Sequence, residues 1–341
     1  MIKSMCFGRM LRRVAARASR SSGAPRADLG ARGAPRLLAH AVVTIMMALQ
    51  CNASAASEPL RVCMAEENPP LSRLANGTMT GLDLRIAREV AAVLRRELVV
   101  VPFDTTYEKE SSLAHEVNAL LSSGVCEAKS GFPLLAGDLG PPSRASSRTA
   151  DYPGAPRKRE RPFVPLKPLS PTRAYQGVAI GAAMRAPADS WSSLTALSER
   201  PHWRVGAVSG TMAGTVALMW RHGALRSQLV SLSHGESALD ALAAGRLDVA
   251  LVPIAQFDGW RLAHARPSLT LAGWRKPIDV NLGFVTLASN ESLRNAIDAV
   301  ISSALADGRL EGWATAEGAT WLPPRTPDVS NGPTLVQLVA D

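Results

Sequence analysis

The chain has 341 residues, of which 46% are hydrophobic and 20% are charged. This balance supplies enough apolar surface for one large or two modest globular domains. It excludes a disordered chain, a collagen-like fibre and a disulfide-dense miniprotein. The formal net charge of +9 is typical of a nucleic-acid-binding protein, so the position of that charge has to be established first.

Most of the positive charge lies in residues 1–56, which hold nine basic residues and one acidic residue. An apolar stretch follows at 37–49, and small residues follow at 53–56. A basic region, a short apolar region and an Ala-x-Ala site are together typical of a secretory signal peptide. We predict that 1–56 is a cleaved signal peptide and that the mature protein is periplasmic. The alternative is a basic tail followed by a buried helix.

Strands and helices alternate in the next part of the chain. Apolar runs predict buried strands, and apolar residues at helical spacing predict amphipathic helices. In chain order, the pattern predicts a strand at 60–65, a helix at 82–94, a strand at 98–101, a helix at 113–121 and a strand at 126–130. This order predicts a parallel sheet with covering helices.

A basic, proline-rich segment interrupts the pattern at 140–174. It contains eight prolines, which exclude an ordinary helix or an inner strand, and eight basic residues against two acidic ones. It is either a solvated loop that wraps a lobe or a basic docking surface or lid. The remaining mature chain is acidic overall, so we expect no nucleic-acid partner.

A helix that ends on glycine and leads into a strand occurs twice. Residues 120–128 and 242–249 share this pattern, with Gly124 and Gly245 at the helix ends. A strand at 204–208 and a helix at 212–220 precede the second copy. The repetition predicts two α/β lobes of related build.

Two cysteines, Cys63 and Cys126, remain in the mature chain. An even pair in an oxidising compartment is a candidate disulfide, and the alternative is two buried free thiols. The histidines show no metal-ligand spacing, and the chain has no phosphate-binding loop, H-E-x-x-H or G-x-S-x-G motif. We therefore predict no metal, no cofactor and no catalytic residue.

Four motifs resemble those of family 3 extracellular solute-binding proteins. They are CMAEENPPL at 63–71 with GTMTGLDLRIA at 77–87, RVGAVSGT at 204–211, ALAAGRLDV at 241–249, and NLGFV at 281–285 followed by a helix. The resemblance covers 60–132 and 175–321. It implies an α/β fold of two periplasmic-binding-protein-like lobes, each a mainly parallel sheet flanked by helices, with a ligand in the cleft between them.

The resemblance also implies a domain order. Lobe 1 begins at 57–139, the basic insertion or hinge occupies 140–174, and lobe 2 occupies 175–279. The chain returns to lobe 1 at 280–325, and a tail follows at 326–341.

Seven residues are candidates for ligand contact. Ser209, Gly210 and Thr211 precede a helix, whose free N–H groups and positive dipole end suit an anion such as a carboxylate. The alternative is that this turn only caps the helix. The other four candidates follow strand ends, where open α/β sheets bind ligands: Glu66, Asn68, Phe132 and Gln256.

The chain departs from the amino-acid-binding members in two places. Those members carry an arginine after the last strand of the first lobe, whereas here Ser130–Leu134 contains none. They also carry an aspartate after the strand of the second lobe, where this chain has Pro253. Both ends of the clamp for a zwitterion are altered, which argues against a standard α-amino acid.

The cysteines and the Gly131-Phe132-Pro133 segment are similar to a subgroup of binding-protein-like accessory proteins. These proteins are associated with quinoprotein alcohol dehydrogenases, including methanol oxidation systems. The resemblance to family 3 solute-binding proteins as a whole implies a periplasmic receptor that captures a small anionic or polar solute for an ABC-type importer. The alternatives are an accessory factor that contacts a periplasmic dehydrogenase and, third, a dehydratase-like enzyme on the same fold. We expect a monomer whose partners are a small solute and either transporter membrane subunits or a dehydrogenase.

Overall fold

The structure is a computed structural model that describes residues 58–186, 191–264 and 268–340. The predicted signal peptide at 1–56 lies outside these residues. Residues 56–341 form one unit of the chain, and the description that follows concerns this unit.

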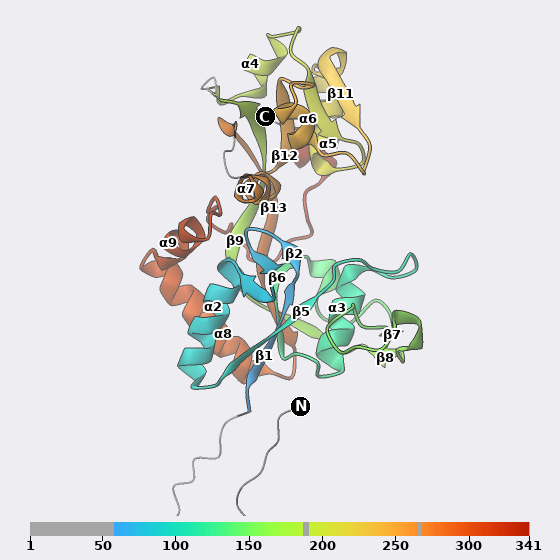
Figure 1. The fold of residues 1–341 in the computed structure, drawn as a ribbon, viewed down its shortest axis with the longest axis vertical. Coiled ribbons are helices and arrows are strands. Elements are labelled where there is room, and N and C mark those ends of the chain that lie inside the picture. Colours follow the sequence, from blue (N-terminus) through green and yellow to red (C-terminus); the bar gives the residue numbers. More distant parts are fainter. Residues whose placement is uncertain (1–57, 187–190, 265–267, 341) are drawn as a thin grey trace, which may run out of the picture. The chain divides into compact units, whose positions relative to one another are not determined.

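An eight-stranded sheet with the order β11-β10-β12-β9-β13-β6-β1-β5 runs through the described chain (Figure 1). In the first lobe, β1 (Leu60–Ala65) lies between β5 (Leu98–Phe103) and β6 (Ala128–Pro133), and all three are parallel. These are the three strands that the apolar runs predict. The buried residues of β1 and β6 agree with strands covered on both faces, whereas β5, at the edge of the sheet, is half-buried along most of its length.

Successive residues of β1 face two different cores. Val62 and Met64 pack among α2 (Leu82–Leu94), α8 (Glu291–Ala306) and α9 (Arg309–Ala316). Cys63 and Ala65 pack with residues of α3 (Leu113–Ser122), because neighbouring side chains of a strand point to opposite faces. The predicted helices at 82–94 and 113–121 are therefore the covering layers of the first lobe.

Helix α2 begins at Gly81 for a steric reason. The φ angle of Gly81 is +115°, and a Cβ at this position would lie 2.3 Å from the carbonyl oxygen of Leu71. Only glycine fits this turn. The G-x-x-x-G-L-D motif thus fixes where the first helix starts.

The second lobe repeats the arrangement. Strand β10 (Val205–Val208) lies between and parallel to β11 (Leu229–Leu232) and β12 (Val249–Pro253). Helices α5 (Met212–Met219) and α6 (Ala238–Ala243) contribute to its two cores. The other helices after residue 185 are α4 (Leu194–Ser198), α7 (Ile254–Ala263) and α10 (Leu335–Val339).

Two long antiparallel strands connect the lobes. Strand β9 (Leu169–Arg185) pairs with β12 of the second lobe, and β13 (Leu269–Leu287) pairs with β6 of the first. They also pair with each other, with several register shifts along their length (Figure 1). The predicted boundaries at 174/175 and 279/280 fall inside these strands rather than in loops.

The disulfide between Cys63 and Cys126 is confirmed. It joins β1 to the loop before β6, with a Cα–Cα distance of 5.7 Å. Both cysteines are buried in the core beside α3.

The basic insertion packs on the first lobe. Lys158 pairs with the buried Glu116 of α3 at 2.8 Å, and Arg148 pairs with Glu108 at 3.4 Å. The buried Arg161 donates to the carbonyl oxygens of Thr149 and Ala150 at 3.0 and 2.8 Å. Part of the basic charge therefore holds the loop in place, which favours a wrapping loop for this part of the segment.

Short strands and four 3-10 helices complete the described secondary structure; the 3-10 helices are Ala136–Asp138, Lys158–Glu160, Trp220–His222 and Arg226–Gln228. The short strands are β2 (Glu67–Asn68), β3 (Ser72–Ala75) and β4 (Thr78–Thr80), which form one small sheet, and the paired β7 (Ser146–Ser147) and β8 (Val164–Pro165) of the insertion. Among the described residues, no helix has the length and apolarity needed to cross a membrane.

Candidate ligand-binding site

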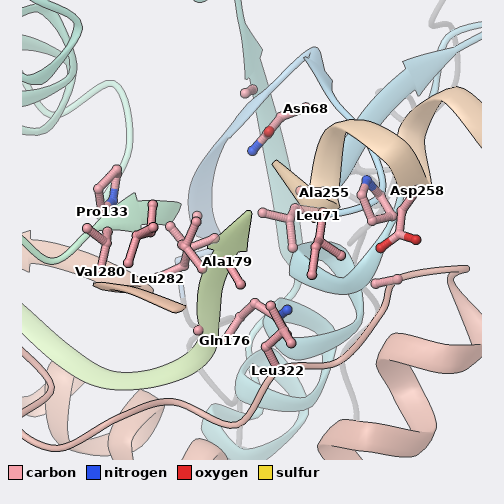
Figure 2. Close-up of a pocket in the computed structure, with 18 of the residues that line it drawn as sticks. Asn68, Leu71, Pro133, Gln176, Ala179, Ala255, Asp258, Val280, Leu282 and Leu322 are labelled. Carbon is pink, nitrogen blue, oxygen red and sulfur yellow. The ribbon is translucent and has the colours of Figure 1, made fainter. Parts of the chain in front are cut away.

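A cavity of about 510 Å³ lies where the two connecting strands pass between the lobes (Figure 2). Residues of both lobes and of β9 and β13 line it. The apolar side chains among them include Leu71, Phe103, Leu135, Val178, Ala179, Ile254, Ile278, Val280, Leu282 and Leu322. The walls are therefore largely apolar, as is usual for small-molecule sites.

Strand β6 contributes Lys129, Gly131 and Pro133 to the cavity. Its pairing with β13 shifts register between Lys129 and Phe132, and Gly131 has a φ angle of +60°, so the side chains do not alternate regularly here. Phe132 does not line the cavity and is 3% exposed in the core beside α3. The predicted contact residue Phe132 thus lies next to the cavity in sequence but is a core residue.

Lys129 brings an ammonium group into this apolar wall. The residue is 5% exposed, and its Nζ donates to the carbonyl oxygen of Gly131 at 2.8 Å. The rings of Phe103 and Phe132 have their centroids 6.0 and 5.4 Å from Nζ, which is the outer range of cation–π attraction. Burial lowers the pKa of Lys129 to about 8, and the charge of Asp83 opposes this shift.

Asp83 lies in the first turn of α2, behind Gly131. It accepts a hydrogen bond from the Tyr175 hydroxyl at 2.5 Å, and its Oδ2 has no hydrogen-bond partner among the described residues. Burial raises the pKa of Asp83 to about 6, while the hydrogen bond from Tyr175 lowers it. Burial and the charge of Asp83 raise the pKa of Tyr175. A Cβ on Gly131 would lie 2.8 Å from Asp83 Oδ2, so glycine keeps β6 close to this carboxylate.

The raised pKa of Asp83 predicts a pH dependence of stability. The folded state binds the Asp83 proton more tightly than the unfolded state, whose value is 3.8, so stability is greatest below pH 4 and falls as pH rises through 6. In Asp83→Asn this contribution is absent. We expect the difference in the free energy of unfolding between wild type and variant to change by about 3 kcal/mol between pH 4 and 7. Urea unfolding at several pH values measures it. A constant difference would contradict the prediction, and Asp138→Asn on an exposed turn is the control.

Gln176 and Asp258 are two further polar residues that line the cavity (Figure 2). The Gln176 amide donates to the carbonyl oxygen of Thr320 at 3.0 Å, while its buried Oε1 has no partner among the described residues. Asp258 accepts from the backbone N–H of Thr320 at 2.6 Å, from its hydroxyl at 2.9 Å and from Arg261 at 3.4 Å. The hydrogen-bonding capacity of Asp258 is thus largely used within the chain.

Helix α7 closes one side of the cavity against the first lobe. A Cβ on Gly259 of α7 would lie 2.9 Å from the carbonyl oxygen of Pro69, so the helix and the loop are in close contact. Arg261 donates to the carbonyl oxygen of Gly318 at 2.9 Å. Together with the Asp258–Thr320 bonds, these contacts hold α7 to two segments of the first lobe, the loop at Pro69 and the chain after α9.

Of the predicted contact residues Asn68, Glu66 and Gln256, one lines the cavity, and a second lines a groove beside it. Asn68 lines it and points into the space shown in Figure 2. Glu66 is half-buried and does not line it, whereas its neighbour Glu67 does. Gln256 lines an adjoining groove of about 460 Å³, which shares Asn68 and Ala255 with the cavity.

Ser209, Gly210 and Thr211 lie outside the main cavity. Ser209 and Gly210 line a separate small pocket of about 110 Å³. The Thr211 hydroxyl accepts from the N–H of Gly214 at 3.0 Å and caps α5. Only the next residue, Met212, reaches the main cavity. Thr211 therefore caps the helix, as the alternative interpretation of this turn predicts. Ligand contact by Ser209, Gly210 and Thr211 remains a prediction.

Among the described residues, no cluster of three or more His, Cys, Asp and Glu side chains is placed to hold a metal ion. The ionisable residues that line the cavity are Glu67, Lys129 and Asp258. The arrangement suits recognition of a small molecule by one cation and a few hydrogen-bonding groups.

Comparison with family models and with curated proteins gave no match. Solved structures do match. An ancestral cationic amino acid solute-binding protein is 16% identical with a TM-score of 0.52, over 76% of this chain and 94% of that chain. The L-cystine solute receptor of Neisseria gonorrhoeae in its unliganded open conformation is 14% identical with a TM-score of 0.53, over 79% and 96% of the two chains.

A third match is substrate-binding domain 2 of Lactococcus lactis GlnP in an open conformation. It is 12% identical with a TM-score of 0.53, over 75% of this chain and 93% of that chain. These likenesses show the fold: the chain has the two-lobed α/β architecture of periplasmic binding proteins that the motifs predict.

Proposed function

We propose that the protein is an exported receptor that captures a small solute between its two lobes and delivers it to an ABC-type importer. The observation that carries the proposal is the cavity of about 510 Å³ between the lobes, built on the two strands that connect them. Such a site allows a ligand to favour one relative arrangement of the lobes by hinge motion, which a membrane partner can recognise. The names of the matched structures, two of them amino-acid or cystine receptors, support a solute of similar size.

The walls argue against a standard α-amino acid as that solute. No arginine of the described residues lines the cavity, and the aspartate that does, Asp258, already accepts three hydrogen bonds from Thr320 and Arg261. A ligand with an apolar body and few polar groups matches the lining better, since unpaired polar groups are costly in such a site.

Native mass spectrometry of the exported protein tests the proposal, followed by a thermal-shift screen of small solutes. We expect a co-purifying molecule, or a solute that stabilises the protein by about 2.7 kcal/mol at a hundredfold excess over Kd. The receptor proposal would be contradicted if no small molecule co-purifies, no solute of the screen binds, and the protein instead forms a stable complex with a dehydrogenase.

That second outcome would favour an accessory role beside a periplasmic quinoprotein dehydrogenase. The bonded pair Cys63 and Cys126 supports it, because these cysteines carry the resemblance to the accessory subgroup. The exposed basic residues of the insertion, among them Arg157 and Arg159, are then candidates for the partner contact.

A further inference from the structure

Lys129 occupies an unusual place for a lysine. It lies on an inner strand between β1 and β13, it is 5% exposed, and it faces the cavity. Lysines are almost never this buried unless they are paired. In the described part of the chain, no carboxylate forms an ion pair with Lys129, and the one acceptor recorded for its three N–H bonds is the Gly131 carbonyl oxygen.

Among the described residues, no nearby acidic side chain forms a hydrogen bond or an ion pair with Lys129. Asp83 is packed behind Gly131 and bonded to Tyr175, and its charge acts on Lys129 without direct contact. Asp258 is held by Thr320 and Arg261, and Glu67 is exposed. An ammonium with no carboxylate in contact is costly in an apolar wall, so an anion from outside the chain that contacts Nζ would gain by binding here. At neutral pH the ammonium form dominates, because the pKa of Lys129 is about 8.

We propose that the cavity binds a small monocarboxylate with an apolar body, whose carboxylate pairs with Lys129. This inference rests on the proposed receptor function and names its class of ligand. One buried ammonium neutralises one negative charge, so a phosphate dianion would leave excess charge in the apolar walls. The unpaired Oε1 of Gln176 offers an acceptor for one hydroxyl or N–H group elsewhere on the ligand.

Calorimetry with matched probes tests this assignment. Each set shares one carbon skeleton and differs in its polar groups: hexanoate, hexanamide and L-norleucine, and 3-phenylpropanoate, 3-phenylpropanamide and L-phenylalanine. In wild type we expect the carboxylate to bind about 10 to 100 times more tightly than its amide. We also expect it to bind more tightly than the amino acid, whose ammonium has to be desolvated and finds no free buried carboxylate among the described residues of the cavity.

Lys129→Met removes the charge and keeps an unbranched side chain. We expect the carboxylate and amide to bind this variant with nearly equal affinity, and its thermal stability to equal or exceed that of wild type. Lys167→Met, at an exposed lysine of the insertion, is the matched control and should keep the full preference.

Each other outcome overturns a defined part of the inference. If wild type binds amides as tightly as carboxylates, or Lys129→Met keeps the preference, the role of Lys129 is refuted while the receptor function stands. If the amino acids bind most tightly, the monocarboxylate class is refuted. If neither these probes nor any solute of the screen binds, the receptor function itself fails.

Discussion

Replacing Cys63 and Cys126 together by alanine is expected to lower the free energy of unfolding by about 4 kcal/mol. The disulfide spans 63 residues of sequence, and a cross-link of that span removes much of the conformational freedom of the unfolded chain. Both sulfur atoms are buried, so their loss also leaves small voids in the core beside α3. Urea unfolding of oxidised wild type and of the double variant measures the difference.

The reduced wild-type protein separates the two contributions. It keeps the sulfur atoms but lacks the cross-link, so its stability should lie between those of the oxidised protein and the double variant. Equal stability of the oxidised and reduced proteins would contradict the prediction. The disulfide also holds β1 to the loop before β6; Asn68 of the cavity follows β1 in the chain, and Lys129 of the cavity lies in β6. We therefore expect ligand affinity to fall with the loss of the cross-link.

Local sequence patterns were sufficient to predict the parallel core of each lobe. The apolar residues of 82–94 recur at helical spacing, and the helix observed there, Leu82–Leu94, has the same limits. The strand at 60–65 is likewise an apolar run except for the exposed Arg61. These elements bury one face or both faces, so the spacing of their apolar residues in the sequence predicts which residues are buried.

The connecting strands could not be predicted in the same way. Strand β9 contains Pro171, and β13 contains Pro277 and two glycines; these residue types normally mark turns or strand edges. They are strands because each pairs with the other and with one lobe, with register shifts where the pairing is irregular. Such pairing joins residues about 100 positions apart in the chain, so no local pattern records it.

Of the residues that the sequence pointed to, Asn68 lines the cavity and Gln256 lines the adjoining groove. The sequence also pointed to Phe132, whereas its neighbours Lys129, Gly131 and Pro133 line the cavity. The pairing of β6 with β13 shifts register between Lys129 and Phe132, and this irregular pairing is not visible in the local sequence. The sequence did contain one indication that Lys129 belongs to the site. It is a lysine within a run of otherwise uncharged residues at 128–132, and an inner strand rarely carries a charge without a partner.

A bulky side chain at position 179 tests whether the cavity is the ligand site. Ala179 lies on β9, is 3% exposed and lines the cavity, and Figure 2 places it among the apolar side chains of the wall. We expect Ala179→Phe to lower the affinity for the solute identified by the screen at least about 100-fold, because the ring occupies space that the ligand needs. The stability of the unliganded protein should change by no more than about 1.5 kcal/mol, since the cavity offers room for the ring.

The matched control is Ala244→Phe, at an exposed alanine after α6 and outside the cavity, which should leave affinity unchanged. Comparison with Ser209→Ala then separates the two candidate sites. If Ala179→Phe binds the solute as wild type does and Ser209→Ala does not, the ligand lies at the start of α5 and the cavity assignment is wrong. If Ala179→Phe alone loses binding, the apolar walls select the solute. Thr211 then acts on binding only by positioning Met212, the residue of α5 that reaches the cavity.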